Sequence, residues 1–160
     1  MGTGKSTVGR GLAKSLKMQF FDSDQEIERR TGASVALIFE IEGEKGFRKR
    51  EAEIIDELTK HANIVLATGG GAVLDPDNRK IIGDRGLVVY LRTGLDRLVQ
   101  RTSRDNKRPL LKTGDPAAKL HELLATRAPL YEALADLIID TDRRTIQSII
   151  EEIEEHRVLQ

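Results

Sequence analysis

The sequence predicts an α/β fold with a parallel sheet, and three observations predict it. Short apolar runs alternate with segments of helical periodicity. A glycine-rich run, GTGKST at residues 2–7, opens the first helical segment. The length of 160 residues suits one compact domain, which we place over residues 1–160.

In the first half of the chain, the elements follow from apolar spacing and from glycines. Val8, Leu12 and Leu16 share one face of the first helix. Gly32 and Gly43 end the two short helices that follow the first strand. The predicted elements in this half are helices at residues 5–17, 25–30, 34–42 and 47–60, and strands at 20–22 and 64–67.

In the second half, a polar and basic segment at residues 104–115 interrupts the pattern and is long enough to form a lid. Pro116 suits the first position of a helix, and Pro129 is expected to end that helix soon after Arg127. Isoleucines spaced i, i+3, i+4, i+7 mark a closing helix. The predicted elements are strands at 87–91 and 137–139, and helices at 95–102, 116–127 and 146–153.

Composition excludes several classes of protein. The chain has 26 Lys and Arg against 26 Asp and Glu, so its formal net charge is zero and neither nucleic acid nor an anionic membrane is an expected partner. It has no Cys, which excludes disulfides and thiolate metal sites. No apolar run approaches the length of a bilayer span, and no signal-peptide pattern is present. We expect a cytoplasmic protein.

The run at residues 2–7 matches the second half of the phosphate-binding motif G-x-x-x-x-G-K-[ST]. Backbone N–H groups of such a loop form a nest for anionic oxygens, and the helix dipole adds positive potential. Lys5 would reach the β- and γ-phosphates, and the Ser6 hydroxyl suits Mg²⁺. The alternative is an ordinary glycine-rich helix start. The predicted nucleotide-binding residues here are Gly2, Thr3, Gly4, Lys5, Ser6 and Thr7.

Two further candidate segments follow predicted strands, at the sheet edge where ligands bind in open α/β folds. Asp22 can hold Mg²⁺ through water and Asp24 can accept a hydrogen bond from a substrate hydroxyl, although both also suit acidic helix caps. The three glycines at 69–71 allow a ligand to approach the backbone, although a flexible turn is the alternative.

Arg48, Arg108 and Arg127 are the cationic candidates, although a single Arg on a helix is usually solvated. Arg108 lies in the predicted lid, and Arg127 precedes the Pro129 that is expected to end its helix.

Taken together, these segments resemble the shikimate kinase family, small P-loop kinases of the aromatic amino-acid pathway. The resemblance covers residues 1 to about 153, nearly the whole chain. The P-loop alone is common to many families, whereas the full ordered set is specific. The set is GTGKST at 2–7, FDSD at 21–24, RTG at 30–32, GEKGFR at 43–48, ATGGGA at 67–72, VYL at 89–91, RPLL at 108–111 and RAPLY at 127–131.

The resemblance implies a three-layer α/β/α P-loop kinase fold with strand order 2-3-1-4-5, and ATP-dependent phosphorylation of the shikimate 3-hydroxyl. It implies a monomer with shikimate, ATP and Mg²⁺ as ligands, a shikimate-binding helical segment at 24–60 and a lid at 104–115. It assigns catalysis to Lys5, Asp24 and Arg108; nucleotide binding to residues 2–7 with Arg101, Arg108 and Arg144; shikimate binding to Asp24, Arg48, Gly69, Gly70, Gly71 and Arg127; and the metal to Ser6 and Asp22.

The sequence departs from the family at its amino end, where the first strand and the first P-loop glycine are missing. We therefore predict that Met1 is an internal methionine and that the upstream reading frame encodes a short apolar strand. Without that strand, the sheet is expected to split into two halves with unpaired inner edges.

Two alternatives stay open at this point. One is another small-molecule P-loop kinase, such as one that acts on gluconate, because a paired arginine clamp suits any carboxylate. The other is a nucleotide-binding remnant without catalytic activity. The RPLL and GGG segments favour shikimate as substrate.

Overall fold

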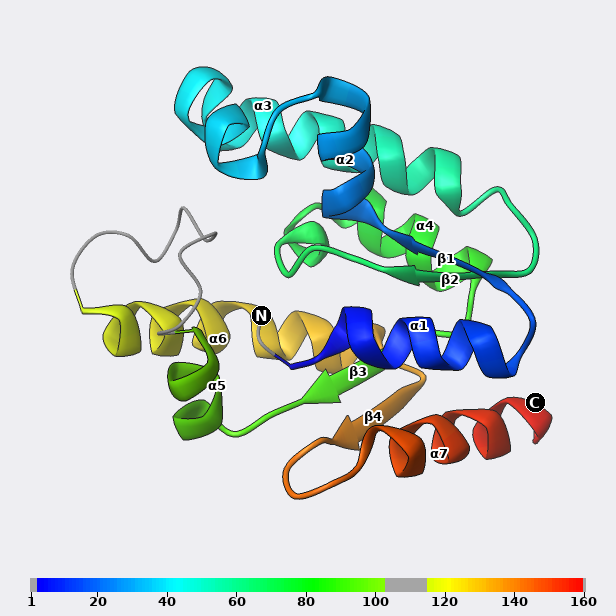
Figure 1. Ribbon diagram of the computed structural model, residues 1–160. Coiled ribbons are helices and arrows are strands. Elements are labelled where there is room, and N and C mark those ends of the chain that lie inside the picture. The colour runs from blue at the N-terminus through cyan, green and yellow to red at the C-terminus, as the bar shows by residue number, and fades with distance from the viewer. Residues whose placement is uncertain (1–2, 103–114, 160) are drawn as a thin grey trace.

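The computed structural model describes residues 3–102 and 115–159, which contain four parallel strands (Figure 1). β1 (Gln19–Asp22) pairs with β2 (Ile64–Ala67), and β3 (Val89–Arg92) pairs with β4 (Leu137–Asp140). In each pair, the chain passes from one strand to its parallel partner through helices, which is the crossover that parallel pairing requires. The predicted parallel α/β fold is confirmed.

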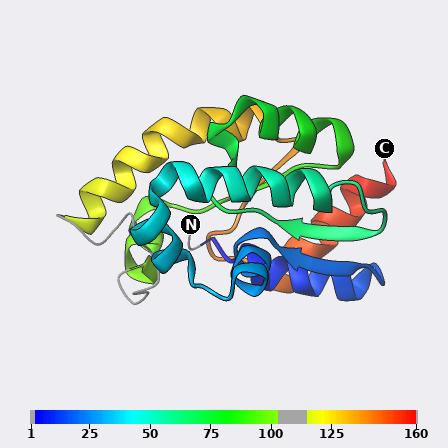
Figure 2. The same ribbon diagram turned by 90° about the horizontal axis from the view of Figure 1, so that it is seen from above.

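The helices complete three layers. Figure 2 shows α1 and α7 on one side of the strands and α4 and α6 on the other, with α5 near the end of α6. Helices α1, α2, α3 and α7 pack through apolar side chains, as the sequence periodicity predicts. The helices are α1 (Lys5–Ser15), α2 (Ser23–Thr31), α3 (Val35–Leu58), η1 (Ala72–Leu74, 3₁₀), α4 (Pro76–Arg85), α5 (Leu95–Thr102), α6 (Pro116–Leu134) and α7 (Ile146–Val158).

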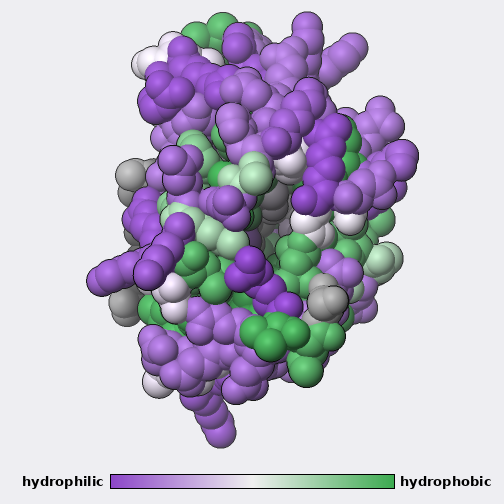
Figure 3. Space-filling model, turned by 90° about the vertical axis from the view of Figure 1, so that its right-hand side faces the viewer, coloured by the Kyte–Doolittle hydropathy of each residue, from purple (hydrophilic) through white to green (hydrophobic). Residues whose placement is uncertain are grey.

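The sheet is split in two. Among the described residues, no strand lies between β2 and β3, which agrees with the expectation of two half-sheets. Alternate residues of a parallel strand bond to opposite neighbours, so each inner edge presents backbone groups to the gap. Figure 3 shows a hollow between the two halves with apolar side chains around it. The inner-edge residues are Ile64 and Leu66 of β2 and Val89 and Leu91 of β3.

Each half of the molecule has its own apolar core. One cluster gathers α1, α7 and the β3–β4 pair around Leu12, Leu91 and Ile139. The other gathers α2 and α3 around Ile27, Phe47 and neighbouring side chains. Within the described part of the chain, no helix has the length and apolar character needed to cross a membrane.

Caps and glycines set the helices around β1 as the sequence predicts. The Ser34 hydroxyl accepts the Leu37 N–H at 3.2 Å and begins α3. Gly32 ends α2 with φ 68°, and Gly43 breaks α3 internally with φ 71°. The two helices predicted on either side of Gly43 are therefore present, joined end to end across a kink.

Two expectations need correction. Pro129 does not end its helix, because α6 continues to Leu134 and stacks Tyr131 on Tyr90 with ring centroids 4.9 Å apart. Such packing offsets a proline cost of about 3 kcal/mol in a helix interior. The sequence reading also missed η1 and α4, although Asp75 before Pro76 was an available cap signal.

Candidate active site

The loop that enters α1 leaves its first N–H groups available to a ligand. Gly4 adopts a left-handed conformation with φ 90°, and no side chain caps the helix. The Thr3 hydroxyl next to it is buried and lacks a hydrogen-bond partner among the described residues. A bare helix N-terminus beside an unsatisfied hydroxyl fits an anion such as phosphate. Of the predicted nucleotide-binding residues, Gly2 lies outside the described residues and Thr7 is exposed.

Ser6 and Asp22 meet between α1 and β1. The Ser6 hydroxyl donates to Asp22 Oδ2 at 2.6 Å, while Asp22 Oδ1 caps α2 by accepting the N–H groups of Asp24 and Gln25. A hydroxyl and a carboxylate are the oxygen ligands that Mg²⁺ uses when it keeps most of its waters. In the described ranges, no group of three or more acidic or His side chains could hold a metal alone. The pair therefore fits a cation that is shared with a bound phosphate.

Asp24 lies in the first turn of α2 and has a carboxylate oxygen that is buried and unpaired. Burial is the main cause that raises the pKa of Asp24, and the nearby charge of Asp22 adds to it. Lys5 and Arg48 are close enough to act in the opposite direction. This carboxylate thus combines a buried, unpaired oxygen with the nearby charges of Lys5 from the phosphate loop and of the Arg48 guanidinium group.

Arg48, on α3, lies near Asp24. Its Nη1 donates to Glu51 Oε2 at 2.6 Å, and its Nη2 donates to Glu44 Oε1 at 3.2 Å. Glu51 is fully buried, with 0% of its side chain exposed, and its second oxygen is unpaired. Burial raises the pKa of Glu51, and the charge of Arg48 opposes that shift. The ion pair fixes the direction of the guanidinium group while one fifth of the Arg48 side chain stays exposed.

The three glycines after β2 lie against these side chains. A Cβ on Gly69 would lie 2.5 Å from Glu51 Oε1 and 2.7 Å from Asp24 Oδ1, and one on Gly71 would collide with the Arg48 guanidinium. The Gly69 N–H donates to the Ser23 hydroxyl at 2.9 Å. The absence of side chains at these positions is therefore what allows the two carboxylates and Arg48 to converge on this loop.

Arg127 joins the cluster from α6 and is only 4% exposed. Its charge lowers the pKa values of Glu51 and Tyr131, although burial leaves both raised. The Tyr131 hydroxyl donates to the Gly70 carbonyl oxygen. Segments far apart in the sequence thus bring two guanidinium groups and two carboxyl groups to one loop.

Other predicted residues lie elsewhere. The Arg144 guanidinium pairs with Glu152 and donates to the Ser148 carbonyl at 2.8 Å, both on α7. Arg101 belongs to α5, but the structure does not describe its side chain. Arg108 and the predicted lid up to residue 114 are also outside the described residues.

The sequence reading missed Ser23, Glu51 and Tyr131 in this cluster. The signal for two of them was available, because Glu51 follows Arg48 by three residues and Tyr131 follows Arg127 by four. Such spacings place side chains on one helix face.

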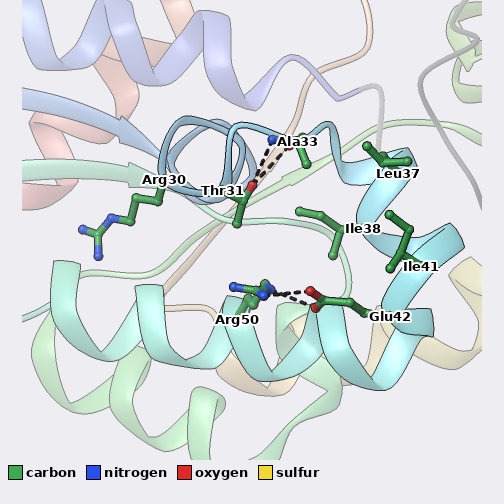
Figure 4. A pocket seen from close by; sticks show the side chains of 8 residues that line it. All are labelled: Arg30, Thr31, Ala33, Leu37, Ile38, Ile41, Glu42 and Arg50. Atoms are coloured by element: carbon green, nitrogen blue, oxygen red, sulfur yellow. Dashed lines mark hydrogen bonds and ion pairs between the residues drawn. The ribbon is translucent and has the colours of Figure 1, made fainter.

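A separate pocket of about 300 Å³ lies between α2 and the first part of α3 (Figure 4). None of the predicted site residues lines it. Its two arginines are paired, Arg30 with Glu57 at 2.6 Å and Arg50 with Glu42 at 2.7 Å. The charged cluster around residues 69–71 is therefore the better candidate for catalysis.

Comparison with known proteins identifies the family. The family model described as shikimate kinase matches residues 1–157. The chain belongs to the shikimate kinase family. As a member of that family, it is an ATP-dependent kinase.

Relatives and solved structures agree with this membership. The chain is 53% identical over 153 residues to a shikimate kinase of Legionella pneumophila strain Corby, covering 96% of this chain and 87% of the relative. It is 56% identical over 150 residues to a shikimate kinase of Burkholderia thailandensis, covering 94% and 82%. The structure of shikimate kinase from Acinetobacter baumannii in complex with shikimate matches with a TM-score of 0.96 and 47% identity, over 99% of this chain and 88% of that one.

Proposed function

We propose that this kinase transfers the γ-phosphoryl group of ATP to the 3-hydroxyl group of shikimate. The observation that carries the proposal is the setting of Asp24, whose buried and unpaired carboxylate oxygen is in a side chain that feels the charges of both Lys5 and Arg48. An acceptor hydroxyl bound at Asp24 would lie between the phosphate loop and a cationic site for the acid group. This order of phosphate, hydroxyl and carboxylate sites suits a hydroxy acid as acceptor.

The acid group would be held by Arg48 and Arg127. Their planar forked donors match a carboxylate, and both are held in direction by neighbours of the cluster. Gly69, Gly70 and Gly71 would line the ring of the substrate, because a Cβ at either end of this loop would collide with the cluster. We assign the helical segment 24–60 to shikimate binding, since both Asp24 and Arg48 lie in it.

The phosphate groups would be held by the loop at residues 2–7, with Lys5 on the β- and γ-phosphates. Ser6 and Asp22 would hold Mg²⁺, which supplies positive charge to the phosphates when it is bound. Arg101, Arg108 and Arg144 are the further nucleotide-binding candidates. Residues 104–115 would cover the site as a lid and exclude water from the transfer.

The rate of this reaction depends more on the alignment of the reacting groups than on proton transfer. Phosphoryl transfer proceeds through a loose transition state, so charge neutralisation and alignment dominate. Lys5 and Arg108 would neutralise charge on the transferred group. Asp24 would orient the acceptor hydroxyl and take its proton late, which its raised pKa permits.

We further propose that the protein works as a cytoplasmic monomer that binds neither nucleic acid nor membrane. Its formal net charge of zero supports the last part of this proposal, because a binding surface for polyanions usually carries an excess of basic residues.

The test is ADP release by the purified protein with shikimate, with gluconate and with neither. With ATP present, we expect turnover with shikimate but not with gluconate, and a phosphate ester at the 3-position in the ³¹P spectrum of the product. Lys5→Ala should lower this turnover by about 10²–10³-fold. Equal turnover with gluconate would assign the site to a broader class of hydroxy acids. ADP release that ignores both acids would contradict the proposal.

A further inference from the structure

We propose that Tyr131 is a positioning residue whose hydroxyl group ties α6 to the glycine loop and thereby holds Arg127 at the correct distance for a substrate carboxylate. The inference rests on the proposed function and adds a residue that acts through others. Three observations carry it: the hydrogen bond that Tyr131 makes, the proline that precedes it, and the stacking of its ring.

The hydrogen bond joins Tyr131 to the centre of the loop. Its hydroxyl donates to the Gly70 carbonyl oxygen. The flanking residues are held from elsewhere, Gly69 by Ser23 on α2 and Gly71 by close contact with Arg48 on α3. Tyr131 therefore supplies a hydrogen bond that ties α6, the helix that carries Arg127, to the centre of the loop.

Pro129 explains why α6 needs such a tie. It lies inside the helix between Arg127 and Tyr131 and has no N–H group, so the ladder loses one hydrogen bond there. A helix with a broken ladder bends more easily at that point. A bend between these two residues would shift Arg127 relative to Arg48, and the bond to Gly70 opposes it.

The ring of Tyr131 is held independently of its hydroxyl. It stacks on Tyr90 of β3 with centroids 4.9 Å apart and ring planes at 33°. Burial raises the pKa of Tyr131, so the hydroxyl keeps its proton at neutral pH and stays a donor to Gly70. Removal of the hydroxyl alone should therefore leave the ring in place and release its two polar contacts, the link to Gly70 and the hydrogen bond with Arg127, both of which position Arg127.

Tyr131→Phe tests the inference, with Tyr90→Phe as a matched control. Tyr90 belongs to the same stacked pair, but it lies on β3 rather than on the helix that carries Arg127. We expect Tyr131→Phe to raise the KM for shikimate about 2- to 10-fold, the range of one neutral hydrogen bond. The KM for ATP, kcat and the thermal melting temperature should change little, and Tyr90→Phe should match the wild type in every measurement.

A substrate without the negative charge separates positioning from a general loss of structure. Shikimate methyl ester cannot use the arginine clamp, so Tyr131→Phe and wild type should have equal kcat/KM on the ester. An equal loss on acid and ester, or an equal rise in the KM for ATP, would overturn the inference. So would identical kinetics for the two Phe variants. If wild type itself does not phosphorylate shikimate, the proposed function fails instead, which the same assay reveals.

Discussion

The two sides of the site depend on different chemical groups of the protein. The phosphate side, residues 3–6 with Asp22, depends on backbone N–H groups at an uncapped helix end. The acid side, defined here by Asp24, Arg48, Glu51, Arg127 and residues 69–71, depends on side chains that come from α2, α3 and α6. The acid side is cross-linked by ion pairs and hydrogen bonds. The position of the phosphate side depends on how α1 packs against the sheet.

Their surroundings differ in the same way. The acid side rests on a core in which Ile27, Phe47 and Leu58 are almost fully buried. The strands beside the phosphate side, β2 and β3, do not pair with each other, and most of their apolar side chains are only partly buried. Changes to the sheet should therefore act on stability and phosphate binding, whereas changes to single side chains should act on acid binding.

The largest expected effect comes from supplying a strand to the gap. We would extend the chain before Met1 by about seven residues: five apolar and β-branched ones, then Gly and one further residue, which completes the motif G-x-x-x-x-G-K-[ST]. Burying each large aliphatic side chain contributes roughly 1.5–3 kcal/mol, so the free energy of unfolding should rise by several kcal/mol. A Gly/Ser extension of equal length is the control, and thermal melts compare the two. Equal melting temperatures for both extensions would show that the gap does not accept a strand.

Lys5→Ala should have the next largest effect. Removing a group that stabilises charge developing in the transition state typically lowers kcat by about 10²–10³. Lys14→Ala, an exposed lysine on the same helix, is the control and should behave as wild type. Steady-state kinetics at saturating shikimate measure both. A near-normal kcat for Lys5→Ala would contradict the role that we assign to Lys5 on the phosphate side.

Arg127→Ala should raise the KM for shikimate tenfold or more, since a hydrogen bond to a charged group contributes about 1.5–3 kcal/mol. The KM for ATP should stay near the wild-type value. Arg48→Ala should act in the same way, and the double variant should lose less than the sum of the two because both hold one carboxylate.

Arg50→Ala is the control for Arg48→Ala, because Arg50 lies on the same helix and pairs with Glu42 away from the cluster. Parallel increases in both KM values for Arg127→Ala would place Arg127 outside the acid side.

The smallest effect concerns Asp24 and pH. Burial and the Asp22 charge raise the pKa of Asp24 in the folded state above its unfolded value. At a pH between these two values, the folded state therefore binds more protons than the unfolded state. The free energy of unfolding therefore falls as pH rises through the folded pKa. Asp24→Asn removes this loss and should raise the melting temperature by a few degrees at neutral pH, but not at a pH where both states are protonated, while kcat falls. Thermal melts across pH provide the test, and a lower melting temperature at neutral pH would contradict the sign.

The sequence predicted most of the frame because local signals and packing agree there. Strand β2 is an apolar run that stops at the glycines, and α2 begins at a capping aspartate. The carboxyl-edge rule also placed Asp24 and residues 69–71 together. Helix α4 escaped prediction because residues 76–85 contain only two adjacent isoleucines and no helical stripe. The end of α6 was wrong because stacking of Tyr131 on Tyr90 is a tertiary contact that outweighs the local effect of Pro129.

Glu51 shows the main limit of reading a sequence. A charged residue on a charged helix is normally solvated, yet Glu51 is fully buried against Arg48. Only the arrangement of α2, α3 and the glycine loop makes that burial favourable.

The most direct test of the account is whether the two sides can be lost separately. Calorimetric titration of wild type, Lys5→Ala and Arg127→Ala with ATP and with shikimate, each ligand alone, gives six affinities. We predict that Lys5→Ala weakens ATP binding and leaves shikimate binding near wild type, and that Arg127→Ala does the reverse. If either variant loses both ligands to a similar extent while its melting temperature is unchanged, the division into a phosphate side and an acid side is wrong.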